Sequence, residues 1–205
     1  MNNDAAGLKT QLTAIKADVT KLLAGLNDAN FNWKPDPNQW SIAQGLDHLN
    51  VLGSLYLPQF TEKIVQGPPL VGAQNHQMGW LSRFFIKKME PPVSTKFKAP
   101  APFVPAPEKS LDAVVPEFMQ LQELLAQQIS SANNVDWSRV KVVSPASKLI
   151  HFNLTAAFAV ITSHERRHLW QAWQIRSNPN FPGRIFRANS GNFSAAAGEL
   201  GMATE

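Results

Sequence analysis

Residues 156–176 read AAFAVITSHERRHLWQAWQIR, a run without glycine or proline. Apolar residues recur along it at helical spacing, which predicts an amphipathic helix roughly 30 Å long at about 1.5 Å per residue. Thr155 is the expected N-cap, and Pro179 marks the end of the helix. His164 and His168 lie about one turn apart on the apolar face, so both imidazoles are expected to point into the core.

Two long helices are predicted in the first third of the chain. Helical spacing of leucine and isoleucine residues places one at residues 4–26 and the other at residues 42–66. Ser41 and Gln44 have the form of a capping box, in which each side chain binds a free backbone N–H, and this sets the start of the second helix. Pro58 predicts a kink or an early stop inside it.

A fourth long helix is predicted beyond a proline-rich excursion. The excursion spans residues 67–109, and residues 78–89 carry its one helical pattern. The helix that follows begins either after Ser110 as N-cap or at Pro116 as its first residue, and it runs through Ile129.

The predicted fold class is therefore all-α. Four long helices and no convincing strand favour a four-helix bundle, with a long proline-rich crossover between the second and third main helices. A chain of 205 residues is near the upper end of a single-domain length, so one domain over residues 1–205 is expected. Residues 177–205 show little periodicity and are expected to form an irregular C-terminal tail.

Composition places the chain among globular proteins, with 44% hydrophobic and 17% charged residues. The longest purely apolar run, residues 156–161, is far shorter than the roughly 20 residues of a membrane span, so no membrane partner is expected. The N-terminal residues show no signal-peptide pattern, and the expected location is cytoplasmic. The chain has no cysteine, so any thiol chemistry would need a thiol co-substrate.

The net charge of +4 and the isoelectric point near 9.5 raise the question of nucleic-acid binding. The basic residues are scattered, and those that approach a cluster are Arg83, Lys87, Lys88, Lys96 and Lys98. A solvated positive surface is favoured over a phosphate-binding patch, so no specific nucleic-acid partner is expected.

The pair His164 and His168 is predicted to bind a metal ion. Two adjacent buried imidazoles cost free energy unless each finds a partner, and a divalent cation would supply both. The second helix offers His48 on its core-facing side as a third ligand. The alternative is that all three are hydrogen-bonded core histidines, whereas His76 and His151 are expected in loops or at the surface.

The same stretch also matches H-E-x-x-H, the zinc-protease motif, in which Glu165 would act as general base on zinc-bound water. The glycine and third histidine of the metzincin extension are absent from the residues that begin at Leu169. A downstream carboxylate ligand would have to be Glu199 or Glu205. A zincin-type protease is thus a minor alternative, and Glu165 is otherwise expected behind the metal ligands or at the helix surface beside Arg166.

Three stretches together resemble the DinB-like (DinB/YfiT-like) superfamily of metalloenzymes, and the resemblance covers nearly the whole chain. They are FNWKP at 31–35, QWSIAQGLDHL at 39–49 and HERRHLWQ at 164–171. The resemblance implies a four-helix bundle with a long crossover, and family members often form dimers. It also implies that His48, His164 and His168 bind zinc, nickel or a similar divalent ion, although imidazole also suits iron and manganese.

The resemblance further implies metal-dependent transfer or isomerisation with a low-molecular-weight thiol such as mycothiol or bacillithiol. The leading interpretation is a metal-dependent transferase or hydrolase that acts on a small-molecule substrate. Glu165 or Asp47 is the candidate base or orienting group, and Gln171 is a candidate hydrogen-bond donor behind the ligands. Trp170 is a candidate edge of the substrate pocket, whereas Trp40 is expected to pack in the core. The alternative is a metal-binding stress or interaction protein without turnover.

Overall fold

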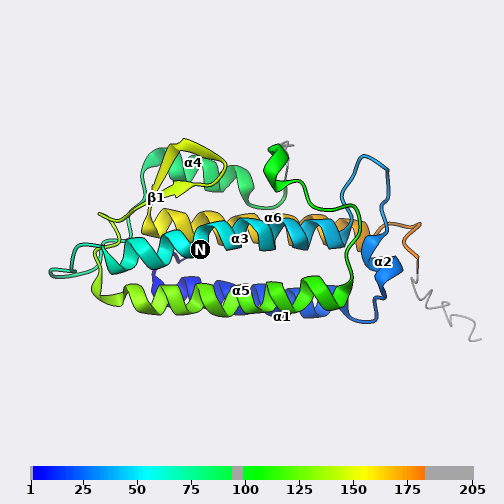
Figure 1. The fold of residues 1–205 in the computed structure, drawn as a ribbon, viewed down its shortest axis with the longest axis horizontal. Helices are drawn as coiled ribbons and strands as arrows, with labels where there is room; N and C mark the ends of the chain where they lie inside the picture. Colours follow the sequence, from blue (N-terminus) through cyan, green and yellow to red (C-terminus); the bar gives the residue numbers. More distant parts are fainter. Residues whose placement is uncertain (1, 94–98, 183–205) are drawn as a thin grey trace, which may run out of the picture.

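The computed structural model describes residues 2–93 and 99–182, which form six α-helices and one strand pair (Figure 1). The elements are α1 (Ala5–Leu23), α2 (Asp28–Asn32), α3 (Ile42–Val65), α4 (Trp80–Met89), α5 (Leu111–Ser131), β1 (Lys141–Ser144), β2 (Ser147–Asn153) and α6 (Leu154–Arg176). Two 3-10 turns, Ala101–Phe103 and Ala132–Asn134, lie before and after α5.

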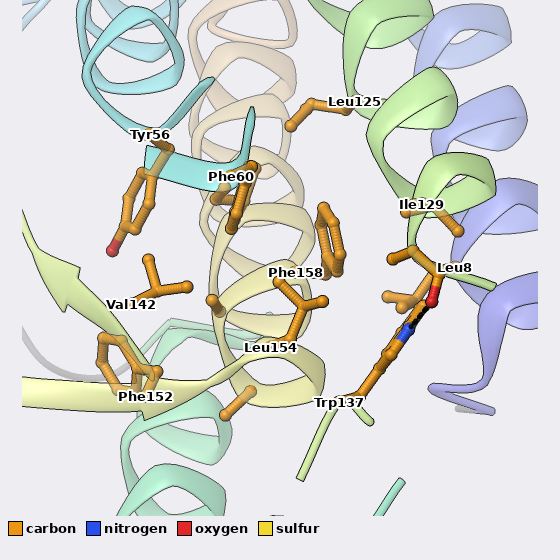
Figure 2. Close-up of a cluster of buried hydrophobic side chains, with 14 of the residues drawn as sticks. Leu8, Tyr56, Phe60, Leu125, Ile129, Trp137, Val142, Phe152, Leu154 and Phe158 are labelled. Atoms are coloured by element: carbon orange, nitrogen blue, oxygen red, sulfur yellow. Dashed lines mark hydrogen bonds between the residues drawn. The ribbon is translucent and has the colours of Figure 1, made fainter. Parts of the chain in front are cut away.

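The four long helices pack in two layers. Helices α1 and α5 form one layer and α3 and α6 the other (Figure 1). Each long helix packs against its neighbour in the same layer and against one helix of the opposite layer, α1 against α6 and α3 against α5. Phe60 of α3 meets Phe158 of α6 with ring centroids 4.5 Å apart, and Leu125 of α5 lies in the same apolar cluster (Figure 2). Burial of these large side chains is the main stabilising term for the packing.

The helix starts follow the predicted capping chemistry at two of three positions. Ser41 and Gln44 form the predicted capping box at the start of α3, and Ser110 rather than Pro116 sets the start of α5. The predicted cap of α6 is wrong by two residues, because Asn153 accepts the hydrogen bond from the backbone N–H of Ala156. Asparagine is among the strongest N-cap residues, so the helix begins at the earlier position.

Two further expectations for the helices are corrected. Helix α1 ends at Leu23 rather than at Leu26, and the chain turns at Gly25, whose φ of 73° lies in the left-handed region that glycine adopts readily. Helix α3 continues through Pro58 to Val65, so the early stop at this proline does not occur.

The expectation of a chain without strands is wrong for residues 141–153. Strands β1 and β2 form an antiparallel pair in which Val142 lies opposite Phe152. Both side chains are buried against the helical core, as Figure 2 shows, while Leu149 and His151 are exposed. Within residues 2–93 and 99–182 only two short strands pair. Their apolar residues directly precede the long apolar run of α6, which hides their alternation in the sequence.

The crossover between α3 and α5 contains α4, close to the predicted helical pattern at residues 78–89. In the loop before α4, His76 packs edge-on against the Trp137 ring, with centroids 4.8 Å apart. Among the described residues, no helix has the length and apolarity of a membrane span. Most of the tail predicted at 177–205 falls in residues 183–205, which lie outside the described part of the chain.

Candidate metal centre

Two neighbouring helices bring three imidazoles together at one point. His48 comes from α3, and His164 and His168 come from successive turns of α6. The ring centroids of His48 lie 5.1 Å from His164 and 4.9 Å from His168. One ring nitrogen from each residue lies within 4.8 Å of the other two, which makes the cluster compatible with a metal site.

The His48 ring is oriented by the crossover segment. Its Nδ1 lies 2.7 Å from the backbone carbonyl oxygen of Phe103. A carbonyl oxygen can only accept a hydrogen bond, so Nδ1 carries the proton and Nε2 keeps its lone pair. This carbonyl contact fixes both the tautomer and the orientation of the ring, which is the usual support behind a metal-binding histidine.

Burial keeps the three imidazoles neutral. Loss of solvation lowers the pKa of His48, and it lowers the pKa of His164 to about 3 with further contributions from His48 and Arg167. Burial also lowers the pKa of His168 well below its ordinary value. At neutral pH the cluster therefore offers unprotonated nitrogens, which is the form that binds a metal ion.

The Nε2 atoms of His164 and His168 lie 3.0 Å apart. Two neutral imidazole nitrogens at this distance share at most one proton, so one of them must act as acceptor toward the other or both must bind a common cation. His48 and His168 are buried, whereas His164 is partly exposed.

Trp40 packs against the cluster, whereas the sequence predicts only a core position for it. Its ring is stacked on His168 at 5.8 Å between centroids and lies 4.9 Å from the His48 ring. The Phe103 carbonyl was also missed. Trp40 directly precedes the N-cap of α3, and this position about two turns before His48 was the available signal for a role at the site.

Gln171 and Asp47 lie close to the histidine cluster. The Gln171 side chain forms a hydrogen bond with His168, which acts to raise the pKa of that histidine against the larger effect of burial. Asp47 is buried and forms an ion pair with Lys109, with 3.3 Å between Oδ1 and Nζ. Trp170 is partly buried, and its role at a pocket edge stays a prediction.

Of the two positions expected for Glu165, behind the metal ligands or at the helix surface, the surface position is wrong. Its side chain is buried, and Oε1 accepts a hydrogen bond of 2.7 Å from Nε2 of Gln122 on α5. Consecutive residues of a helix point about 100° apart, so this carboxylate faces α5 while the neighbouring His164 faces α3. Burial raises the pKa of Glu165 to about 7. This effect is larger than the opposing effects of the hydrogen bond from Gln122 and of the charge of Arg166, which lower the pKa.

Fold and site together define a mainly helical protein with a three-histidine cluster compatible with metal binding. The chain belongs to the DinB superfamily, whose family model matches residues 11–172. A protein of Bacillus subtilis (strain 168) named "Uncharacterized protein YuaE" is 27% identical over 162 residues, which cover 75% of this chain and 88% of that protein. The search of solved structures gave no significant match.

Proposed function

We propose that the chain is a divalent-metal-dependent enzyme on a four-helix-bundle scaffold, with His48, His164 and His168 as the metal ligands. The observation that carries this proposal is the convergence of three neutral imidazoles, one of them already oriented by the Phe103 carbonyl. Zinc and nickel are the first candidate ions, because both bind imidazole well, and iron and manganese are the next.

The donor set fits such an ion. Three neutral nitrogen ligands leave the full positive charge of the ion in place and leave at least one position for an exogenous ligand. The 3.0 Å between Nε2 of His164 and Nε2 of His168 is unfavourable when both nitrogens carry a lone pair and neither a proton nor a cation lies between them. Gln171 would hold the His168 ring in place through its hydrogen bond, in the same way that Phe103 holds His48.

When bound, the ion would supply Lewis acidity and lower the pKa of a coordinated water or thiol. The chain's own residues would orient the substrate and move protons around that position. Asp47 is buried next in sequence to His48, and its ion pair with Lys109 joins it to the end of the crossover. The chain has no cysteine, so a low-molecular-weight thiol is the first co-substrate to test, with a small electrophile as its acceptor.

Non-catalytic metal binding is the second candidate function, as in a stress or interaction protein. The observation that favours it is the cover over the cluster, since His48 and His168 are buried and Trp40 packs on both. A zincin-type protease is disfavoured, because the Glu165 carboxylate binds Gln122 on the α5 side of the helix. A general base must reach the water that it activates.

The experiment that tests the enzyme proposal compares metal-free and metal-loaded protein in one assay panel. Purified protein, stripped with a chelator and reloaded with zinc or nickel, is mixed with small thiols and electrophilic acceptors, and product formation is followed by mass spectrometry. The proposal expects turnover that requires metal and is lost in His164→Ala but kept in the exposed control His151→Ala. Metal binding without turnover of any thiol, ester or amide in the panel would favour the non-catalytic function.

A further inference from the structure

The outward face of α4 carries large apolar side chains that the histidine cluster does not use. Trp80 is 73% exposed, Leu81 58% and Phe84 55%. Trp80 and Leu81 point about 100° apart and Phe84 lies between them, so the three form one apolar face of the usual width for an amphipathic helix. Isolated exposed apolar residues are normal in globular proteins, but an aromatic and aliphatic group of this kind marks an interaction surface.

The opposite face of α4 holds the helix on the fold, so the exposed side chains are not needed for packing. Phe85 and Ile86 pack against the main apolar cluster, and the Phe85 ring lies 6.2 Å from Phe152 of β2. At the end of the helix, the Glu90 carboxylate binds the Arg166 guanidinium of α6 through two hydrogen bonds. Helix α4 is therefore fixed in one orientation, with Trp80 and its neighbours facing solvent.

The β1–β2 hairpin extends the same side of the molecule. It lies with α4 over the layer of α3 and α6, on the side away from α1 and α5 (Figure 1). Leu149 near its turn is 91% exposed and Ile150 37%. We call the exposed residues of these two elements the α4–hairpin surface; its apolar members are Trp80, Leu81, Phe84, Leu149 and Ile150.

Positive charge is concentrated on the same two elements. Helix α4 and the hairpin carry five basic residues and no acidic one: Arg83, Lys87, Lys88, Lys141 and Lys148. The whole chain has 19 basic and 15 acidic residues, so this group accounts for its net positive charge. The Lys88 ammonium lies 5.7 Å from the centre of the Phe84 ring, so basic and apolar groups are interleaved.

We propose that the α4–hairpin surface docks the protein on an anionic lipid membrane. A helix that lies in a membrane interface places Trp, Phe and Leu among the acyl chains and Lys and Arg at the anionic headgroups, and α4 presents both kinds of side chain outward. Lysines flanking the apolar residues reach the headgroups with their ammonium ends while their stems pack on apolar surface.

Other occupants fit the surface less well. A second copy would bring the same five basic side chains face to face, which is electrostatically unfavourable. A nucleic acid would match the charge and stack on Trp80, but it would leave Leu81 and Leu149 in water. The absence of a membrane partner was expected from the lengths of apolar runs, a criterion that tests for a membrane span and not for a docking surface.

Vesicle flotation of the full chain tests the proposal. Lipid vesicles of neutral phosphatidylcholine are compared with vesicles that contain about 30% phosphatidylglycerol, at low and at physiological salt. The protein is expected to float with the anionic vesicles only. Lys87→Glu combined with Lys88→Glu should weaken binding at least 10-fold, because each lysine contributes about fivefold near an anionic surface. Trp80→Ser combined with Phe84→Ser should abolish the binding that persists at physiological salt.

A matched control separates this surface from general charge. Lys9 and Lys21 are exposed on α1, in the opposite layer, and their exchange for Glu makes the same change in net charge. This control is expected to bind as the wild type does, and circular dichroism is expected to show all variants folded, since the changed side chains are exposed. The chelator-treated protein should bind equally well, so failure of metal binding leaves this result unaffected.

Three outcomes would overturn the proposal. One is no flotation with anionic vesicles at low salt. Another is equal loss of binding in the α1 control, which would reduce the effect to net charge. The third is that the exchange of Trp80 and Phe84 for serine leaves vesicle binding unchanged but removes binding to single-stranded DNA, or removes self-association in sedimentation.

Discussion

The carbonyl oxygen of Phe103 lies 2.7 Å from Nδ1 of His48, so the crossover between α3 and α5 is tied directly to the histidine cluster. This contact joins residues 55 positions apart. It turns the Nε2 lone pair of His48 toward the histidines of α6 and so prepares the cluster for a cation.

The first prediction concerns the tautomer of His48. Nitrogen-15 NMR of histidine-labelled protein, free or loaded with zinc, is expected to show His48 protonated at Nδ1 and unprotonated at Nε2, because the Phe103 carbonyl can only accept. The variants His151→Ala and His76→Ala identify the signals of the two histidines that lie outside the cluster. A His48 signal with the proton on Nε2 would contradict the orientation described for this ring.

The second prediction concerns the buried carboxyl of Glu165, whose pKa is raised by burial to about 7 from 4.5. The unfolded chain therefore loses this proton at lower pH than the folded one, and the group's contribution to stability is full below pH 4.5 and is lost as pH rises through 7. Glu165→Gln keeps an acceptor for Gln122 but cannot ionise. It is expected to be more stable than the wild type by on the order of 2–3 kcal/mol at pH 8, with little difference at pH 4.

Urea titrations of both proteins from pH 4 to pH 8 measure this difference. The lowered histidine pKa values act in the opposite direction, since they remove stability as pH falls below 6.5, but they are common to both proteins and cancel. A difference that stays constant with pH would show that Glu165 does not titrate in this range.

The third prediction concerns the close approach of α3 and α5 at Gly53. A β-carbon at this position would overlap the side-chain methyl groups of Leu121, a buried core residue. Gly53→Ala is expected to destabilise the protein by about 1–3 kcal/mol, the usual cost of overpacking. The control is Gly45→Ala on the same helix, where a β-carbon meets nothing within 4 Å, and it should stabilise by about 0.5–1 kcal/mol. Equal effects in thermal unfolding would contradict the described packing.

The fourth prediction concerns the capping box of α3. Ser41→Ala removes the acceptor for the backbone N–H of Gln44, and it is expected to cost about 1 kcal/mol in the free energy of unfolding. The control Ser54→Ala lies in the same helix and bonds only to a carbonyl of the preceding turn, so it should change stability by less than about 0.5 kcal/mol. Since the cap lies two turns before His48, Ser41→Ala should also weaken metal binding, and unchanged affinity would mean that the cap does not position this histidine.

The sequence was sufficient for the long helices and for the three histidines that come together, because the helices and the histidine pair of α6 depend on short-range regularities. The spacing of His164 and His168 is a helical repeat, and the capping box at Ser41 fixes where the helix of His48 begins. The tertiary contacts of the cluster could not be predicted from the sequence. The Phe103 carbonyl and the Trp40 ring meet the cluster only because the crossover and the α2–α3 loop fold back onto α3 and α6.

The strand pair and the position of Glu165 show the same limit. Residues 141–153 have weak alternation, and their pairing depends on docking of Val142 and Phe152 against the helical core. Glu165 follows a charged pattern typical of a helix surface, yet it is buried because α5 supplies Gln122 at the matching height. A single helix pattern carries no information on which neighbour covers each face.

Metal stoichiometry tests the central claim most directly. Elemental analysis of purified protein, after loading with zinc or nickel and removal of free ions, is expected to give about one ion per chain. His48→Ala, His164→Ala and His168→Ala should each lose the ion, whereas His151→Ala should keep it. Wild-type protein without bound metal, or histidine variants that keep the ion of the wild type, would contradict the assignment of this cluster as the metal site.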